Sequence, residues 1–180
     1  MKGVAVLELM EEGRQARRAG KKEEARAAFV RARDAAAAAG DSAGEAEAWC
    51  GLAQLAHDSG ELASGADLYG RALPLFRGAG ASERGAHTVR HIADVQREAG
   101  QFEEAERSYA EAMSIYRQNT EVSPLDIANA LRGYALLKEA VGDTASARAM
   151  WEEAGELYQS FGVEAGVAES NKRIAQMAGK

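Results

Sequence analysis

The sequence predicts an all-α protein built from repeated helix pairs. The composition favours helices, since alanine is abundant and only 2 of the 180 residues are proline. Strands are not expected, because aromatic residues make up only 6% of the chain and β-branched residues are scattered. Regularly spaced glycines indicate a repeat, with intervals of 40, 40 and 42 residues between Gly20, Gly60, Gly100 and Gly142.

Residues at fixed distances from these four glycines support a repeating unit. Nine residues after each glycine stands an aromatic residue: Phe29, Tyr69, Tyr109 and Trp151. Five residues after each glycine, and seven before it, stand small residues: Ala25, Gly65, Ala105 and Ala147, and then Gly13, Ala53, Ala93 and Ala135. Small residues let two helices approach closely, and an aromatic side chain fills the space beside them. Each unit is therefore expected to be a pair of packed helices.

The apolar periodicity divides the chain into four helix pairs and a last single helix. We expect the helices of these pairs at about 4–19 and 21–39, 43–59 and 61–78, 82–99 and 101–118, and 124–141 and 143–161. The four repeats then span about 4–39, 43–78, 82–118 and 124–161. The single helix, at about 164–178, is expected to turn Val167 and Ile174 inward and to cap the array. Residues 1–180 are accordingly interpreted as one repeat domain.

Three local signals refine the expected helix ends. Ser42 followed by Glu45 three residues later matches a capping box, which predicts a helix start at Ser42. Ser123 followed by Pro124 predicts another start, since proline suits the first helical position. Pro74 falls inside an expected helix, which it should kink or shorten.

The pattern resembles the tetratricopeptide repeat. The second unit carries the family's spacing as Trp49-x2-Leu52-Ala53, and then as Gly65-x3-Tyr69-x2-Ala72. The period of about forty residues, longer than the usual thirty-four, looks like the long repeats of Pins-type signalling modulators and of bacterial regulators. The resemblance implies a right-handed α-solenoid of four helix pairs plus a capping helix. It also implies that the first helices line a concave groove.

The composition also limits the classes of function. The net charge of −6 argues against a uniformly basic nucleic-acid binder. The N-terminal apolar run is too short for a signal peptide, and no stretch is long enough to span a membrane. Cys50 is the one cysteine, which fits a reducing compartment. We therefore expect a cytoplasmic protein with neither nucleic-acid nor membrane partners.

Two motifs that suggest an enzyme are weak here. Gly40-Asp41-Ser42-Ala43-Gly44 matches G-x-S-x-G, but that motif requires a preceding strand and here lies between two expected helices. His57, His87 and His91 could together bind a metal, but Thr88 stands where the zinc-protease motif needs glutamate. We therefore expect no catalytic residues, metal or cofactor.

The resemblance to tetratricopeptide repeats also implies which side chains face the groove. Carried over repeat by repeat, the groove residues are Arg14, Arg17, Arg18, Gln54, His57, His87, Arg90, His91, Asp94, Arg97, Asn129 and Arg132. The asparagines with which Pins-type repeats hold a peptide backbone are replaced, at one position, by Gly51, His91 and Gly133. Six arginines against one aspartate give the groove a charge of +5.

A basic groove on an acidic body would attract acidic ligands. The main hypothesis is therefore a non-enzymatic adaptor that binds an acidic peptide or helix of a partner protein in this groove. Binding should weaken between pH 6 and pH 8 if the groove histidines lose their charge in that range.

The alternative hypothesis is a self-associating scaffold. In the first expected helix, apolar residues cover more than one face: Val4, Val6, Leu7, Leu9 and Met10. An exposed apolar patch often marks an interface, so this helix could form a homodimer.

Overall fold

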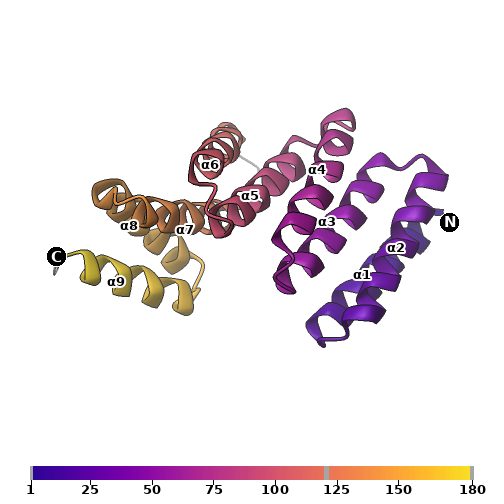
Figure 1. Ribbon diagram of the computed structural model, residues 1–180, viewed down its shortest axis with the longest axis horizontal. Coiled ribbons are helices and arrows are strands. Elements are labelled where there is room, and N and C mark those ends of the chain that lie inside the picture. The colour runs from indigo at the N-terminus through magenta and orange to yellow at the C-terminus, as the bar shows by residue number, and fades with distance from the viewer. Residues whose placement is uncertain (1, 120–121, 179–180) are drawn as a thin grey trace.

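The computed structural model describes residues 2–119 and 122–178, and over these residues it contains nine helices and no strand (Figure 1). The prediction of an all-α fold is therefore confirmed. The helices are α1 (Lys2–Arg18), α2 (Lys22–Ala39), α3 (Ser42–Asp58), α4 (Leu62–Gly78), α5 (Ser82–Glu98), α6 (Phe102–Gln118), α7 (Pro124–Ala140), α8 (Thr144–Ser160) and α9 (Glu164–Ala178).

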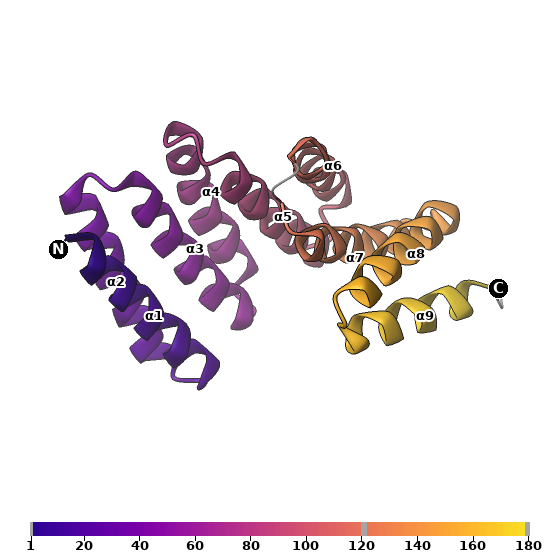
Figure 2. The ribbon, with the colours of Figure 1, turned by 180° about the vertical axis from the view of Figure 1, so that it is seen from behind.

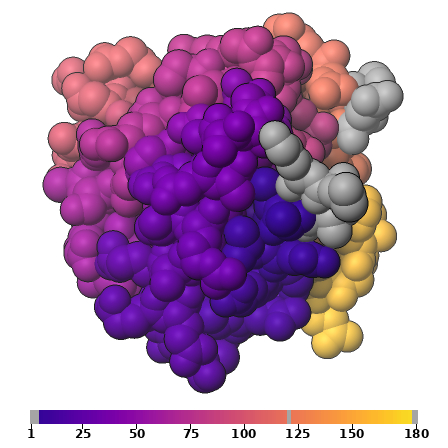
Figure 3. All heavy atoms as spheres, turned by 90° about the vertical axis from the view of Figure 1, so that its right-hand side faces the viewer, coloured from indigo at the N-terminus to yellow at the C-terminus, as the bar shows by residue number. Residues whose placement is uncertain are grey.

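Consecutive helices pack in pairs, and the pairs follow one another along the molecule as an α-solenoid. Figures 1 and 2 show α1 and α2 at the N-terminal end and α9 beside α8 at the C-terminal end. Figure 3 looks at the N-terminal end, where the first pair covers most of the face. The interpretation of residues 1–180 as one domain, and of 164–178 as its cap, stays a prediction.

Glycines close most of the turns between helices, but α6 ends at Gln118 without one. Among the residues that the structure describes, seven glycines have positive φ values between 68° and 81°: Gly20, Gly40, Gly60, Gly80, Gly100, Gly142 and Gly162. At Gly20, the amide of Lys21 donates to the carbonyl of Ala16 at 2.9 Å, which closes the helix end. The building unit is thus one helix and one turn, about half the period found in the sequence. Gly40, Gly80 and Gly162 have this same role, which the forty-residue period did not predict.

Aromatic side chains of the second helices fill the core, as the repeat pattern predicted. Phe29, Tyr69, Tyr109 and Trp151 are each at most 1% exposed. A Cβ atom added at Gly13 of α1 would come within 2.5 Å of the Phe29 ring, and one added at Gly51 of α3 within 2.7 Å. The ring of Phe29 therefore lies between two glycines, one from its own repeat and one from the next.

Two of the local predictions need correction. The cap of α3 is Asp41 rather than Ser42, since the Asp41 carboxylate accepts a hydrogen bond from the amide of Gly44 at 2.9 Å. Helix α4 is not shortened by Pro74, because it continues to Gly78. The predicted start at Ser123 is confirmed, with its hydroxyl accepting from the amide of Leu125 at 3.3 Å.

The apolar residues of α1 mostly point inward. Val6 and Met10 are 3% and 2% exposed, and Leu9 is half-buried. Leu7 is 61% exposed, while Val4 lies outside the residues whose side chains the structure describes. The apolar pattern of this helix thus reflects packing more than an outward face. In the described ranges, no helix is both long and apolar enough to cross a membrane.

Candidate functional site

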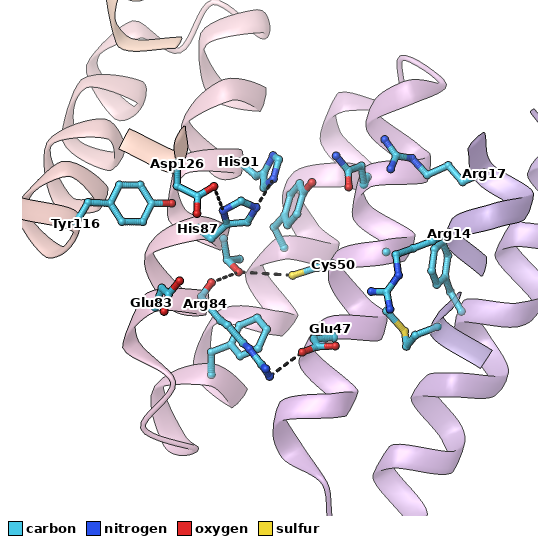
Figure 4. Close-up of a pocket in the computed structure, with 17 residues that line it drawn as sticks. Arg14, Arg17, Glu47, Cys50, Glu83, Arg84, His87, His91, Tyr116 and Asp126 are labelled. Atoms are coloured by element: carbon cyan, nitrogen blue, oxygen red, sulfur yellow. Dashed lines mark hydrogen bonds and ion pairs between the residues drawn. The ribbon is translucent and has the colours of Figure 1, made fainter. Parts of the chain in front are cut away.

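A pocket of about 330 Å³ lies between the first helices α1, α3 and α5, with α6 and α7 at one end (Figure 4). Its apolar lining includes Met10, Phe29 and Phe76, and the half-buried thiol of Cys50. Burial raises the pKa of Cys50 to about 11, so its sulfur stays a neutral thiol at neutral pH. The pocket therefore combines an apolar lining with charged and polar groups at its two ends.

Five of the twelve predicted groove residues line this pocket: Arg14, Arg17, Gln54, His87 and His91. The other seven do not: Arg18, His57, Arg90, Asp94, Arg97, Asn129 and Arg132. Four charged residues of the lining were not predicted from the sequence: Glu47, Glu83, Arg84 and Asp126. Two tyrosines of second helices, Tyr69 and Tyr116, were not predicted either. The predicted set thus overlaps with the pocket only in residues of the first three repeats.

Several predicted groove cations join neighbouring first helices. Arg17 of α1 donates to Asp58 of α3 at 2.6 Å. Arg132 of α7 donates two hydrogen bonds, of 2.7 and 3.1 Å, to the carboxylate of Glu169 in α9. Such bidentate pairs fix geometry as well as charge. These arginines therefore have a structural role in the stack.

A similar contact joins α3 to α5. The Nε2 atom of His57 lies 2.7 Å from the Glu98 carboxylate, which also accepts from Arg97 at 3.0 Å. The expected charge of +5 omitted carboxylates such as that of Glu98, which lie against the predicted cations. These carboxylates offset part of the positive charge that was predicted for the groove.

Arg90 belongs to a largely buried network. It donates to Asp94 at 2.7 Å and to Nε2 of His91 at 2.6 Å, while the hydroxyl of Tyr109 donates to Asp94 at 2.6 Å. The Arg90 and Asp94 side chains are only 11% and 16% exposed. Replacing one partner of a buried pair leaves the other charge uncompensated. Arg90 and Asp94 are thus parts of the core.

His91 is mainly a packing residue. Its ring stacks on Tyr69 with the ring centres 5.4 Å apart and the planes 2° from parallel. Burial, the Arg90 guanidinium and the neighbouring His87 hold the pKa of His91 well below its usual value. Burial and Arg90 also lower the pKa of His87. The lowered pKa values of His87 and His91 argue against the expected loss of charge from these two histidines between pH 6 and pH 8.

The residues considered for catalysis and metal binding do not assemble into such sites. Nε2 of His87 and Nε2 of His91 are 3.2 Å apart, but His57 pairs with Glu98 instead. Within residues 2–119 and 122–178, no three histidine, cysteine, aspartate or glutamate side chains are grouped to hold a metal ion. Ser42 opens α3 behind another helix, so the strand that a nucleophile elbow needs is missing there.

Polar groups without partners lie at the α5–α7 end of the pocket. In the described part of the chain, Glu83 forms neither a hydrogen bond nor an ion pair, and Asp126 faces only Nδ1 of His87, at 3.8 Å. The hydroxyls of Tyr69 and Tyr116 are buried and have no hydrogen-bonding partner there. By contrast, Arg84 is paired with Glu47 at 2.6 Å.

Comparison with known proteins agrees with this architecture. The family model of the tetratricopeptide repeat matches residues 45–118, which covers α3 to α6. These residues belong to the tetratricopeptide repeat family. Among curated proteins, no sequence matches the chain.

Solved structures extend the likeness of the tetratricopeptide repeat fold to nearly the whole chain. BtubC (BKLC) from P. vanneervenii has a TM-score of 0.76 and 20% identity, covering 99% of this chain and 83% of its own. PilF of Pseudomonas aeruginosa has a TM-score of 0.69 and 17% identity, covering 98% and 78%. A putative kinesin light chain from Podosopora anserina has a TM-score of 0.60 and 16% identity, covering 96% and 94%. At these identities the likeness concerns the fold.

One position of the tetratricopeptide repeat has a clear structural role in this chain. Where Pins-type repeats carry asparagine, Gly51, His91 and Gly133 each lie against the aromatic residue of the preceding repeat. A Cβ atom at Gly133 would come within 2.6 Å of the Tyr109 hydroxyl, as one at Gly51 would approach the Phe29 ring. These residues therefore serve packing between repeats.

Proposed function

We propose that this tetratricopeptide repeat protein is a non-catalytic adaptor that binds a segment of a partner protein in the pocket between α1, α3 and α5. Tetratricopeptide repeats generally mediate protein–protein interaction. The observation that carries the proposal is the pocket itself, whose apolar lining is accompanied by the unpartnered, buried hydroxyls of Tyr69 and Tyr116. Ligand pockets typically combine an apolar surface with a few polar groups that orient the ligand.

The α1 end of the pocket supports an acidic residue in that segment, as the sequence analysis expected. Arg14 and Arg18 both pair with one carboxylate, that of Glu11, at 3.2 and 3.0 Å. Two guanidinium groups thus share one carboxylate, so this group of three side chains beside the pocket has a net charge of +1. We propose that the partner segment places an apolar side chain over Phe29 and Phe76 and an acidic side chain near Arg14.

A pocket-filling variant tests the proposal. Gln54 lines the pocket and is half-buried, so Gln54→Trp should occupy the space at little cost to the fold. The partner is first identified by co-purification with the wild-type protein, and its affinity is then measured by calorimetry. We expect a loss of at least about tenfold, or 1.4 kcal/mol. Gln159→Trp on the exposed surface of α8 is the control and should bind normally.

The acidic residue is tested separately with a matched pair of arginines. Arg14 pairs with Glu11, and Arg107 pairs with Glu104, each three residues along an exposed helix surface and each at 3.2 Å. Arg14→Glu should weaken binding while Arg107→Glu leaves it unchanged. Equal effects of the two charge reversals would mean that only net charge matters and would remove the acidic residue from the proposal.

Self-association is a second candidate, favoured by Leu7, which is 61% exposed on α1. Light scattering at high protein concentration measures the molar mass directly. If α1 forms a dimer, Leu7→Ser should shift the population toward monomer. A wild-type protein that is monomeric at high concentration would exclude this candidate.

We also propose a cytoplasmic location and a partner other than nucleic acid. The first is supported by the lone cysteine, and the second by the net charge of −6. Cell fractionation and a DNA-binding assay at low salt would test them.

A further inference from the structure

The contact between α5 and α7 differs from the other contacts between first helices. Ion pairs join α1 to α3 through Arg17, α3 to α5 through His57, and α7 to α9 through Arg132. Between α5 and α7, the described residues show one charged contact, His87 to Asp126 at 3.8 Å. Because the pKa of His87 is lowered by burial and by Arg90, this contact supplies little positive charge at neutral pH.

Two carboxylates at this end of the pocket form no ion pair with a lysine or arginine of the described residues. Asp126, in the first turn of α7, has a side chain that is only 30% exposed. Glu83, in the first turn of α5, has no ion pair among the residues described. The nearby cation Arg90 is already held by Asp94 at 2.7 Å. A partly buried carboxylate without a partner favours a cation beside it.

Tyr116 is an independent sign of a ligand at the same place. Its side chain is 1% exposed, yet its hydroxyl has no hydrogen-bonding partner in the described protein. Figure 4 shows the ring directed toward Asp126 and His87, with Glu83 on the same side of the pocket. Burial raises the pKa of Tyr116, the Arg90 guanidinium lowers it, and the Asp126 and Glu83 carboxylates add to the rise, so Arg90 and both carboxylates lie near the hydroxyl. Buried polar groups normally have partners, so this hydroxyl is available to one that enters the pocket.

We propose that the α5–α7 end of the pocket is a subsite for a basic side chain, lysine or arginine, of the partner segment. The cation would lie between the carboxylates of Asp126 and Glu83 and donate a hydrogen bond to the Tyr116 hydroxyl. This inference rests on the proposed function and names a second chemical requirement of the partner. The bound segment then carries an acidic residue toward α1 and a basic residue toward α7, with an apolar residue between them.

The subsite can be tested without the partner. The probe is N-acetyl-arginine amide, and N-acetyl-citrulline amide is its uncharged analogue of nearly the same shape. Chemical shifts of the His87 and Asp126 amides are followed by NMR up to about 10 mM probe, where a millimolar dissociation constant is measurable. We expect saturable shifts with the arginine probe and at least about tenfold weaker binding of the citrulline probe. Equal binding of both probes, or no saturable shift, would overturn the proposal.

Variants that each remove one carboxylate charge show where the arginine probe binds. Asp126→Asn and Glu83→Gln should each weaken the arginine probe by about tenfold, the effect expected for losing a charge-assisted hydrogen bond. Glu103→Gln removes a comparable first-turn carboxylate from α6, outside the pocket, and should have no effect. If all three variants bind the probe like the wild type, the cation binds elsewhere and the proposal fails.

Partner and probe binding by the variants distinguish an error in this inference from an error in the proposed function. If Gln54→Trp abolishes partner binding while Asp126→Asn and Glu83→Gln do not weaken it, the pocket binds the partner but no basic side chain is recognised. If the arginine probe binds at Asp126 while Gln54→Trp leaves partner binding intact, the cation subsite exists but the proposed function is wrong.

Discussion

The substitution Gly51→Ala tests the packing between the first two repeats. Its added methyl group would come within 2.7 Å of two carbons of the Phe29 ring, closer than carbon atoms approach without strain. The ring cannot easily retreat, because Gly13 lies equally close on α1, with its own added Cβ at 2.5 Å. Phe29 is 1% exposed, so the ring is closely surrounded by other atoms, although it also borders the pocket between α1, α3 and α5.

The expected cost follows from two opposing effects. Forcing an extra methyl group into a packed core typically costs about 1–3 kcal/mol. Alanine is better than glycine inside a helix by roughly 0.5–1 kcal/mol. Gly51→Ala should therefore destabilise the protein by about 1–2 kcal/mol. The additional substitution Phe29→Leu should cancel part of that cost, since a smaller side chain makes room for the methyl group.

Urea denaturation followed by circular dichroism measures these differences. The control is Gly70→Ala, because Gly70 lies inside α4 with open space where its Cβ would be. That substitution should stabilise the protein by up to about 1 kcal/mol. If Gly51→Ala is as stable as Gly70→Ala, Phe29 does not lie between the two glycines as described, and the reasoning is refuted.

Three further predictions follow from the same structure. Folding lowers the pKa of His91, so the unfolded state protonates this histidine first as the pH falls, and stability should be constant above about pH 6.5 and decline below it. Urea denaturation of His91→Gln at several pH values should show a smaller decline. A pH profile identical to that of the wild type would contradict this. Cys50 should react with iodoacetamide at pH 7.5 much more slowly than in urea-unfolded protein, because burial raises its pKa to about 11, and equal rates would contradict that burial. Gly40→Ala should destabilise the protein by about 1 kcal/mol, since φ is 72° there, and an unchanged urea midpoint would contradict it.

The helices could be predicted from the sequence because their signals are local. Apolar periodicity and the turn glycines place each helix end within about two residues, as at α5, expected at about 82–99 and found at Ser82–Glu98. The one cap that was misplaced, Ser42 for Asp41, differs by a single position. Aromatic and small residues at fixed distances from the repeat glycines also predicted the aromatic core around Phe29.

The charge of the site could not be predicted, because its ion pairs join residues about one repeat apart. Arg17 and Asp58 are separated by 41 residues, and Arg132 and Glu169 by 37. Carrying the family's groove positions onto this chain identified the arginines but not the carboxylates that face them. The role of Tyr116 was equally hidden, because second helices were assumed to serve packing alone.

On the first helices, side chains that pair with a neighbouring helix should therefore affect stability, and side chains that line the pocket should affect binding. Arg132 was predicted to bind the partner, but it pairs with Glu169 of α9 and does not line the pocket. Gln54 lines the pocket, and in the described protein it makes no hydrogen bond. We therefore predict that Arg132 contributes to stability and that Gln54 contributes to partner binding.

The most direct test is to measure partner affinity and unfolding free energy for both Arg132→Ala and Gln54→Trp. We predict that Arg132→Ala lowers stability by about 0.5–1 kcal/mol and keeps the wild-type affinity. Gln54→Trp should keep the wild-type stability and lose at least about tenfold in affinity. The opposite result, with binding lost in Arg132→Ala and retained in Gln54→Trp, would contradict the assignment of the pocket as the binding site.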